Sequence, residues 1–112
     1  LTSPGPAGRQ LRSEGLPVIF DAPADLDYDE DGSHRIEAVP EAKDPDMVAM
    51  RALELTGGRV TSFTGEMIDM PAESICIHGD RPNAVDIARR TRQLLQESGV
   101  EIRSLMSKAI RA

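Results

Sequence analysis

The stretch SICIHGDRPNAVDIA, residues 74–88, decides the fold of this chain. Its apolar start at residues 74–77 predicts a short buried strand, and Pro82 can open a long helix that runs to Ser98. In parallel α/β folds the loops at the carboxyl ends of the strands converge, and helix N-termini point free N–H groups into the same space. The polar turn His78-Gly79-Asp80 therefore lies where such a fold builds a site.

The residues of this turn are candidates for chemistry. His78 can act as an acid, a base or an orienting donor, and Asp80 as a base or a hydrogen-bond acceptor. Gly79 lets a ligand approach the backbone or lets the chain adopt a positive φ. Structural roles compete with these: Asp80 suits a helix N-cap equally well, and a lone histidine after a strand is often only a satisfied structural group. Cys76, inside the strand, fits a small buried apolar residue better than a nucleophile.

The first third of the chain combines a helix, a strand and a loop. Pro6 and Gly15 bracket a predicted helix over residues 6–14. The run LPVIF, residues 16–20, has the unbroken apolar pattern of a strand buried in a parallel sheet. The acidic stretch 21–35 has the composition of a solvated loop. It does not fit a calcium-binding loop, because no Glu follows six residues after its glycine.

The rest of the chain predicts a second helix, a hairpin and a final strand. Asp44-Pro45 is a strong helix start and Gly57-Gly58 a strong stop. Met47 and Met50 in this helix are expected to fill the core. The following elements are a hairpin with strands at 59–63 and 67–70, the helix from Pro82 that closes at Gly99, a last strand at 100–103 and a short amphipathic tail at 104–112.

The composition is that of one small globular domain. Hydrophobic residues make up 39% and charged residues 29% of the 112 residues, and the net charge is −6. This acidic balance disfavours nucleic acid as a partner. No apolar run approaches the roughly 18 residues that a membrane span needs, so we expect a cytoplasmic protein. The single cysteine excludes an internal disulfide and a Cys-rich zinc site.

As a motif, SICIHGDRPNAVDIAR resembles the closing motif of the LamB/YcsF family, which includes the A subunit of prokaryotic 5-oxoprolinase. The family's form is close to T-I-C-V-H-G-D-T-P-x-A-V-x-L-A-R, followed by a helix, a Gly and a final strand. QLLQESGVEIR, residues 93–103, continues that pattern. GLPVIFDAPADLDYD, residues 15–29, resembles the family's G-L-P-V-x-x-E-x-F-A-D-R-x-Y-D more weakly, and Asp31-Gly32 matches the D-G that follows.

The chain departs from the family pattern at several positions. Asp21 stands where the family has Glu, which keeps a carboxylate but shortens its reach. Pro23 replaces Phe, and Leu26 replaces Arg, which removes a cation and its bidentate hydrogen bonding. Residues 35–39 are a degraded form of the family's R-x-x-P-G-A-V.

The resemblance implies an α/β fold in which residues 1–112 form a single segment, the C-terminal half of a (β/α) barrel-like domain with a small β-hairpin excursion. The count of elements agrees, because a closed barrel takes eight βα units and about 250 residues. We therefore expect a complementary N-terminal half or partner chain. An uncovered sheet edge would favour aggregation, which also argues for such a partner.

The resemblance further implies a component of a 5-oxoprolinase-like enzyme, which uses ATP to hydrolyse 5-oxoproline or a related lactam together with B-like and C-like subunits. His78 and Asp80 would be the acid-base groups, with Asp21, Asp25 and Gly79 supporting them or the substrate. No P-loop is present, so ATP phosphates would be held by loop backbone near Pro82 or by another chain. No metal ligand is assigned: metal at His78 and Asp80 stays open, because carbohydrate deacetylase-like barrels hold metal with such residues, but two ligands are too few to assert it.

An alternative from a different class is a non-catalytic scaffold or regulatory subunit of such a complex. The missing N-terminal half and the loss of the family's Arg at Leu26 favour it.

Overall fold

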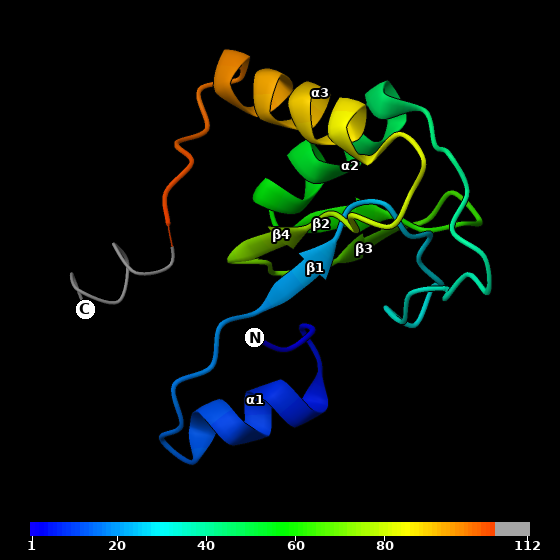
Figure 1. The fold of residues 1–112 in the computed structure, drawn as a ribbon. Coiled ribbons are helices and arrows are strands. Elements are labelled where there is room, and N and C mark those ends of the chain that lie inside the picture. The colour runs from blue at the N-terminus through cyan, green and yellow to red at the C-terminus, as the bar shows by residue number, and fades with distance from the viewer. Residues whose placement is uncertain (105–112) are drawn as a thin grey trace.

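The computed structural model describes residues 1–104. Two helices, α2 (Pro45–Thr56) and α3 (Ala84–Glu97), lie together on one side of the strands, while α1 (Pro6–Ser13) stands apart near the N-terminus (Figure 1). The fold is mixed α/β, as the sequence predicts. Within residues 1–104, no helix is long and apolar enough to span a membrane.

Strands β1 (Asp21–Pro23) and β4 (Ser74–Cys76) form a parallel pair, with Asp21 opposite Ser74. The strand predicted at 74–77 is confirmed, but the one predicted at 16–20 is wrong. Leu16 is half exposed, and Phe20 makes only an isolated bridge to Thr2. The carbonyl of Phe20 accepts hydrogen bonds from the N–H groups of residues 73 and 74, so the ladder with β4 starts where the apolar run ends.

The acidic stretch 21–35 is only partly a solvated loop. Residues 22–26 and Tyr28 are buried, and the Tyr28 hydroxyl donates to the Pro23 carbonyl at 2.7 Å. Burial raises the pKa of the Tyr28 hydroxyl. The loop prediction fails here because Ala22 and Ala24 belong to the buried core cluster, although acidic residues flank them.

Helix α2 begins and ends as predicted. The Asp44 side chain accepts a hydrogen bond from the Asp46 N–H at 3.0 Å, which is a standard N-cap, and Gly58 has a φ of +82° just past the end. The predicted hairpin follows: β2 (Arg59–Thr61) and β3 (Met67–Asp69) are antiparallel.

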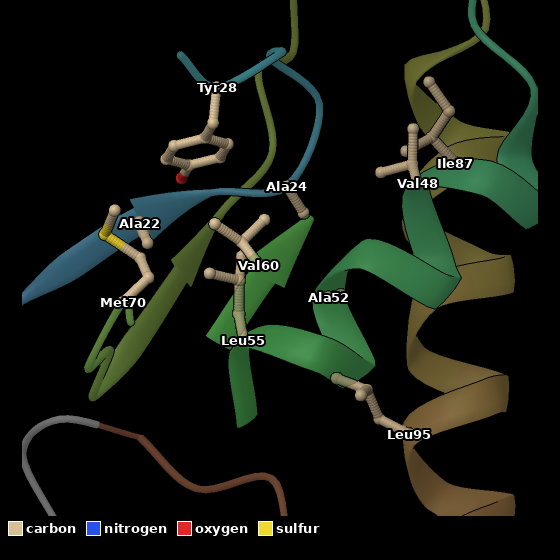
Figure 2. Close-up of a cluster of buried hydrophobic side chains, with 10 residues drawn as sticks. All are labelled: Ala22, Ala24, Tyr28, Val48, Ala52, Leu55, Val60, Met70, Ile87 and Leu95. Carbon is tan, nitrogen blue, oxygen red and sulfur yellow. The ribbon is translucent and has the colours of Figure 1, made fainter. Parts of the chain in front are cut away.

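The core lies between α2, α3 and the strands (Figure 2). Helix α2 contributes four buried side chains, Val48, Ala49, Ala52 and Leu55. Met47 and Met50 are 42% and 64% exposed, so the prediction that they fill the core is wrong. The buried face of α2 is the one with two alanines, which allows α3 to approach closely.

The C-terminal part differs from the prediction in its last element. Helix α3 forms, although it starts at Ala84 after an Asn83 N-cap rather than at Pro82. Within the described residues, 100–103 do not form a strand. The Val100 N–H binds the Leu95 carbonyl at 2.9 Å, which holds this residue in the turn that ends α3. Of the tail predicted at 104–112, all but Ser104 lies outside the described residues.

Candidate functional site

Asp25 and His78 meet where the two parallel strands end. Asp25 follows β1 and His78 follows β4, and the register of the pair brings the two loops together. The Asp25 side chain is fully buried and accepts three hydrogen bonds, from the His78 backbone N–H at 2.9 Å, from His78 Nδ1 at 2.8 Å and from Arg81 Nε at 3.0 Å. The His78 side chain is 42% exposed. One end of the imidazole is therefore fixed, while part of the ring is open to solvent and Nε2 lies 3.9 Å from Cys76 Sγ.

The surroundings of Asp25 keep its carboxyl group ionised. Burial alone raises its pKa, but the hydrogen bonds from the His78 backbone, the His78 ring and Arg81 outweigh burial and lower the pKa below its ordinary value. An ionised carboxylate can only accept, so the His78 ring must donate Nδ1–H to it. In the neutral ring the Nε2 atom then carries the lone pair, which is the arrangement of a general base oriented by a carboxylate.

Arg81 joins the loop after β1 to a second segment, through Asp25 on one side and through Glu37 and Glu41 on the other. Besides Asp25 Oδ2, its N–H groups contact the Asp25 carbonyl at 2.8 Å, the Glu41 carbonyl at 2.9 Å, and Glu37 Oε1 and Oε2 at 3.2 and 2.5 Å. Its side chain is 2% exposed. The hydrogen bonds to Glu37 raise the pKa of the guanidinium, and the one to the Asp25 carboxylate adds to this, against the opposing effect of burial. The cation is thus permanent.

The irregular segment 36–43 is fastened to the site by polar contacts. Lys43 Nζ lies 3.2 Å from Glu37 Oε2, and the Asn83 side chain donates to the Lys43 carbonyl at 2.6 Å and accepts from the Lys43 N–H at 3.2 Å. The hydrogen bond from Arg81, with a further contribution from Lys43, lowers the pKa of Glu37 to about 2. The Glu37 carboxylate is therefore ionised at neutral pH and pairs there with Arg81 and Lys43.

A pocket of about 210 Å³ opens beside His78. Its apolar wall and its polar groups come from the loops after β1 and β4 and from the 36–43 segment: Leu26, His34, Ile36, Glu37, Pro40, His78, Asp80 and Arg81. Both histidines of the chain therefore line the same small pocket.

The residues predicted for the site fall into two groups. His78, Asp25 and Asp80 come together, with Asp80 exposed at the rim of the pocket rather than capping α3, whose N-cap is Asn83. Asp21 does not join them. Because β1 starts at this residue, Asp21 lies opposite Ser74, about 13 Å of strand away from Asp25.

Gly79 and Cys76, the two other candidates near His78, have no contact among the described residues that supports a catalytic role. Gly79 is exposed and its φ is not positive, so of its two suggested uses the positive φ is not realised and the approach of a ligand to the backbone remains a prediction. A Cβ at this position would meet nothing within 4 Å. Cys76 Sγ lies 3.9 Å from His78 Nε2, and burial, aided by Asp21 and Asp25, raises the pKa of the thiol. A neutral thiol is a poor nucleophile.

Metal ligands are not grouped in the described part of the chain. Within residues 1–104, no cluster of three or more His, Cys, Asp or Glu side chains is placed to hold a metal ion.

Arg81 and Glu37 were missed by the sequence reasoning. Arg81 lies inside the quoted motif, yet an arginine before a helix usually indicates only a solvated cation. Nothing local in the sequence pairs it with Glu37, which is 44 residues away. An arginine next to Pro82 in a turn that also holds His78 and Asp80 was the available signal, because buried guanidinium groups need several acceptors.

The match to a known family extends over nearly the whole chain. The family model described as "LamB/YcsF family" matches residues 5–110. The chain belongs to the LamB/YcsF family. The A subunit of 5-oxoprolinase from Streptomyces avermitilis is 43% identical over 91 residues, which are 79% of this chain and 36% of that protein. The protein of the same name from Corynebacterium efficiens is 38% identical over 104 residues, 90% of this chain and 41% of that protein.

A solved structure also matches this fold. The crystal structure of a lactam utilization protein from Thermus thermophilus matches with a TM-score of 0.76 and 31% identity, over 91% of this chain and 42% of that chain. This LamB/YcsF chain thus spans less than half the length of the relatives it matches.

Proposed function

We propose that this LamB/YcsF chain is a component of a 5-oxoprolinase-like enzyme that hydrolyses 5-oxoproline, or a related lactam, to the open-chain amino acid, and that His78 is its general acid-base group. The observation that carries the proposal is the buried Asp25 carboxylate, which fixes the His78 ring at the shared carboxyl end of β1 and β4. Among the relatives that match most of the chain, one is named as part of a 5-oxoprolinase and another as a lactam utilization protein.

The proposed hydrolysis follows from the tautomer of His78. With Nδ1–H donated to Asp25, His78 Nε2 removes a proton from the water that attacks the lactam carbonyl carbon. A C–O bond forms, the ring C–N bond breaks, and His78 returns the proton to the leaving nitrogen. Asp80 at the pocket rim is the second acid-base candidate and can accept the lactam N–H. Gly79, next to His78, leaves open space through which a ligand can approach the backbone.

A lactam is a resonance-stabilised amide, so its carbonyl needs activation, and we propose that ATP phosphorylates the carbonyl oxygen with release of ADP. Attack of water and breakage of the C–N bond then leave an acyl phosphate, which a second water hydrolyses to the carboxylate and phosphate. The described residues do not suit a phosphate themselves. The N-terminus of α3 carries Asp86 in its first turn and follows Asp80, and both carboxylates repel an anion. ATP is therefore proposed to bind outside this segment, and none of its atoms is assigned a contact here.

We further propose that residues 1–112 act as the C-terminal part of a barrel-like domain, completed by an N-terminal half and assembled with B-like and C-like subunits. Three observations support this. The chain covers 36% to 42% of its relatives. Within the described residues, the sheet of β1 and β4 has two strands. Large apolar side chains such as Met50 and Phe63 are more than half exposed.

The test grafts this chain into a relative. Residues 5–104 would replace the matching segment of the A subunit of Streptomyces avermitilis 5-oxoprolinase, co-expressed with the other subunits of that enzyme. Glutamate release from 5-oxoproline would be followed with and without ATP, for the native graft and for His78→Asn. The asparagine side-chain amide can replace Nδ1–H as a donor to Asp25 but cannot accept a proton, so we expect a folded protein with turnover lowered by a factor of about a hundred or more.

The outcomes separate the two classes of function. Turnover that is unchanged by His78→Asn would remove His78 from the mechanism. A graft that assembles with its partners but releases no glutamate under any condition would favour the non-catalytic scaffold instead. Turnover of equal rate without ATP would contradict the ATP requirement alone.

A further inference from the structure

We propose that Arg81 is a positioning residue for His78, acting through Asp25, and that its guanidinium does not bind the substrate. This inference deepens the proposed function and rests on it for its kinetic test, but not for its spectroscopic one. Arg81 lines the same pocket as His78, so a substrate-binding role is the obvious rival.

The first argument is that Arg81 has no donor left for a ligand. A guanidinium carries five N–H groups. The structure gives them five acceptors within the chain: Asp25 Oδ2 and carbonyl, both Glu37 carboxylate oxygens and the Glu41 carbonyl. A substrate carboxylate could bind only by displacing one of these from a side chain that is 2% exposed.

The second argument is that Arg81, together with the His78 backbone N–H that donates to the same oxygen, determines where the Asp25 carboxylate points. Its Nε–H donates to Oδ2, and another of its N–H groups donates to the Asp25 carbonyl, so both ends of the residue are held by one planar group. With Oδ2 fixed in this way, Oδ1 is left facing His78 Nδ1 at 2.8 Å. The orientation of the catalytic ring thus depends on a residue that never contacts the reacting atoms.

A consequence concerns the substrate. Apart from the histidines, Arg81 is the one basic side chain that lines the pocket in the described part of the chain. Since its donors are occupied, the carboxylate of an acid such as 5-oxoproline must find its cation elsewhere. The pocket wall described here is then the side that faces the lactam ring, and the carboxylate-binding group belongs to the complementary half.

Arg81→Lys tests the proposal without removing the charge. Superposed on arginine, lysine places its Cε where Nε was and its Nζ where Cζ was. The variant therefore keeps a cation near Glu37 but loses the donor to Asp25 Oδ2. Two measurements apply: kcat and KM of the grafted enzyme with 5-oxoproline, and the His78 ring Nδ1 proton in ¹⁵N-edited NMR of the 112-residue chain. Arg89→Lys, on the exposed side of α3, is the matched control.

We expect Arg81→Lys to lower kcat roughly ten- to hundredfold with KM within about twofold of native, since a misplaced base slows the chemical step and not binding. The Nδ1 proton should exchange with water faster than in the native chain or become undetectable, while Arg89→Lys changes neither property. Circular dichroism would confirm that both variants are folded.

Two results would overturn the proposal. A raised KM with unchanged kcat would mean that the guanidinium contacts the substrate. A native Nδ1 proton and native kcat, with only a lower thermal midpoint, would reduce Arg81 to a structural role. If the native graft shows no turnover, the proposed function fails, yet the exchange rate of the Nδ1 proton still decides whether Arg81 positions the ring.

Discussion

Replacement of Asp25 by asparagine should destabilise the fold and reverse the tautomer of His78. Both carboxylate oxygens accept from N–H donors, Oδ2 from the His78 backbone and Arg81 Nε, and Oδ1 from His78 Nδ1. Whichever way the asparagine amide is turned, its NH₂ group faces a donor. The lowest-cost position is opposite the imidazole, which can shift its proton to Nε2 and accept at Nδ1 instead.

The expected loss of stability is about 3 kcal/mol. Breaking a buried ion pair by removing one partner costs about 3–5 kcal/mol, because the other charge stays buried and uncompensated. Arg81 keeps Glu37 as a counter-ion in this variant, so the low end of the range applies. The reversed tautomer also removes the lone pair from Nε2, and turnover of the grafted enzyme should fall by several orders of magnitude, as when a catalytic triad loses its aspartate.

Urea unfolding of the chain provides the measurement. The protein has one tyrosine and no tryptophan, so circular dichroism is the main probe and the emission of the buried Tyr28 is a second one. Asp69→Asn, on the exposed side of β3, makes the same chemical change and should leave the unfolding midpoint in place. A loss below about 1 kcal/mol for Asp25→Asn, the size of an exposed pair, would refute the reasoning.

Three further predictions concern pH and packing. Since the pKa of Glu37 falls from 4.5 to about 2 on folding, the stabilising effect of this carboxylate is complete above pH 4.5 and declines as the pH drops toward 2. Urea unfolding midpoints measured from neutral pH down toward pH 2 should therefore fall less steeply in Glu37→Gln than in the native chain. Gly8→Ala would place a Cβ 2.8 Å from a ring carbon of Phe20, so it should destabilise the docking of α1 by about 1–3 kcal/mol in thermal unfolding. Gly5→Ala, with 3.9 Å of space, creates no clash and should have a smaller effect, which comes from the preference for Gly over Ala at the N-cap of α1. Leu55→Ala, in the centre of the core, should cost about 2–5 kcal/mol by urea unfolding with an unchanged slope.

The sequence predicted those elements whose signals are local. Asp44 and Gly58 flank the two ends of α2 as expected, and the Thr64-Gly65 turn lies between the two hairpin strands. The failures have a common cause: they depend on contacts made across the chain. Met47 and Met50 have the right spacing for a core face, but α3 packs against the alanines of α2 instead. The register of β1 is set by β4, not by the apolar run that precedes it.

The candidate site, like the fold, was predicted only where its signals are local in the sequence. The turn at His78 and the candidate Asp25 could be identified because strand ends in α/β folds are where polar groups gather. Their direct pairing required the strand register, and the role of Arg81 required knowledge of which acceptors surround it. Asp80 suited either a cap or a site residue, and its position at the pocket rim, with Asn83 as the cap, removes the first interpretation.

Two residues beside the Asp25 carboxyl group differ from the quoted family pattern, Leu26 and Arg81. Leu26 stands where the family pattern has Arg, and taken alone this loses the cation next to Asp25. The same pattern has Thr where this chain has Arg81, and Arg81 brings a guanidinium to the Asp25 carboxylate from the opposite loop. Leu26, 8% exposed, is then free to form part of the apolar wall of the pocket. In this chain the Asp25 carboxylate has a buried cation beside it without an Arg at position 26, so the loss of that Arg does not by itself favour a non-catalytic scaffold.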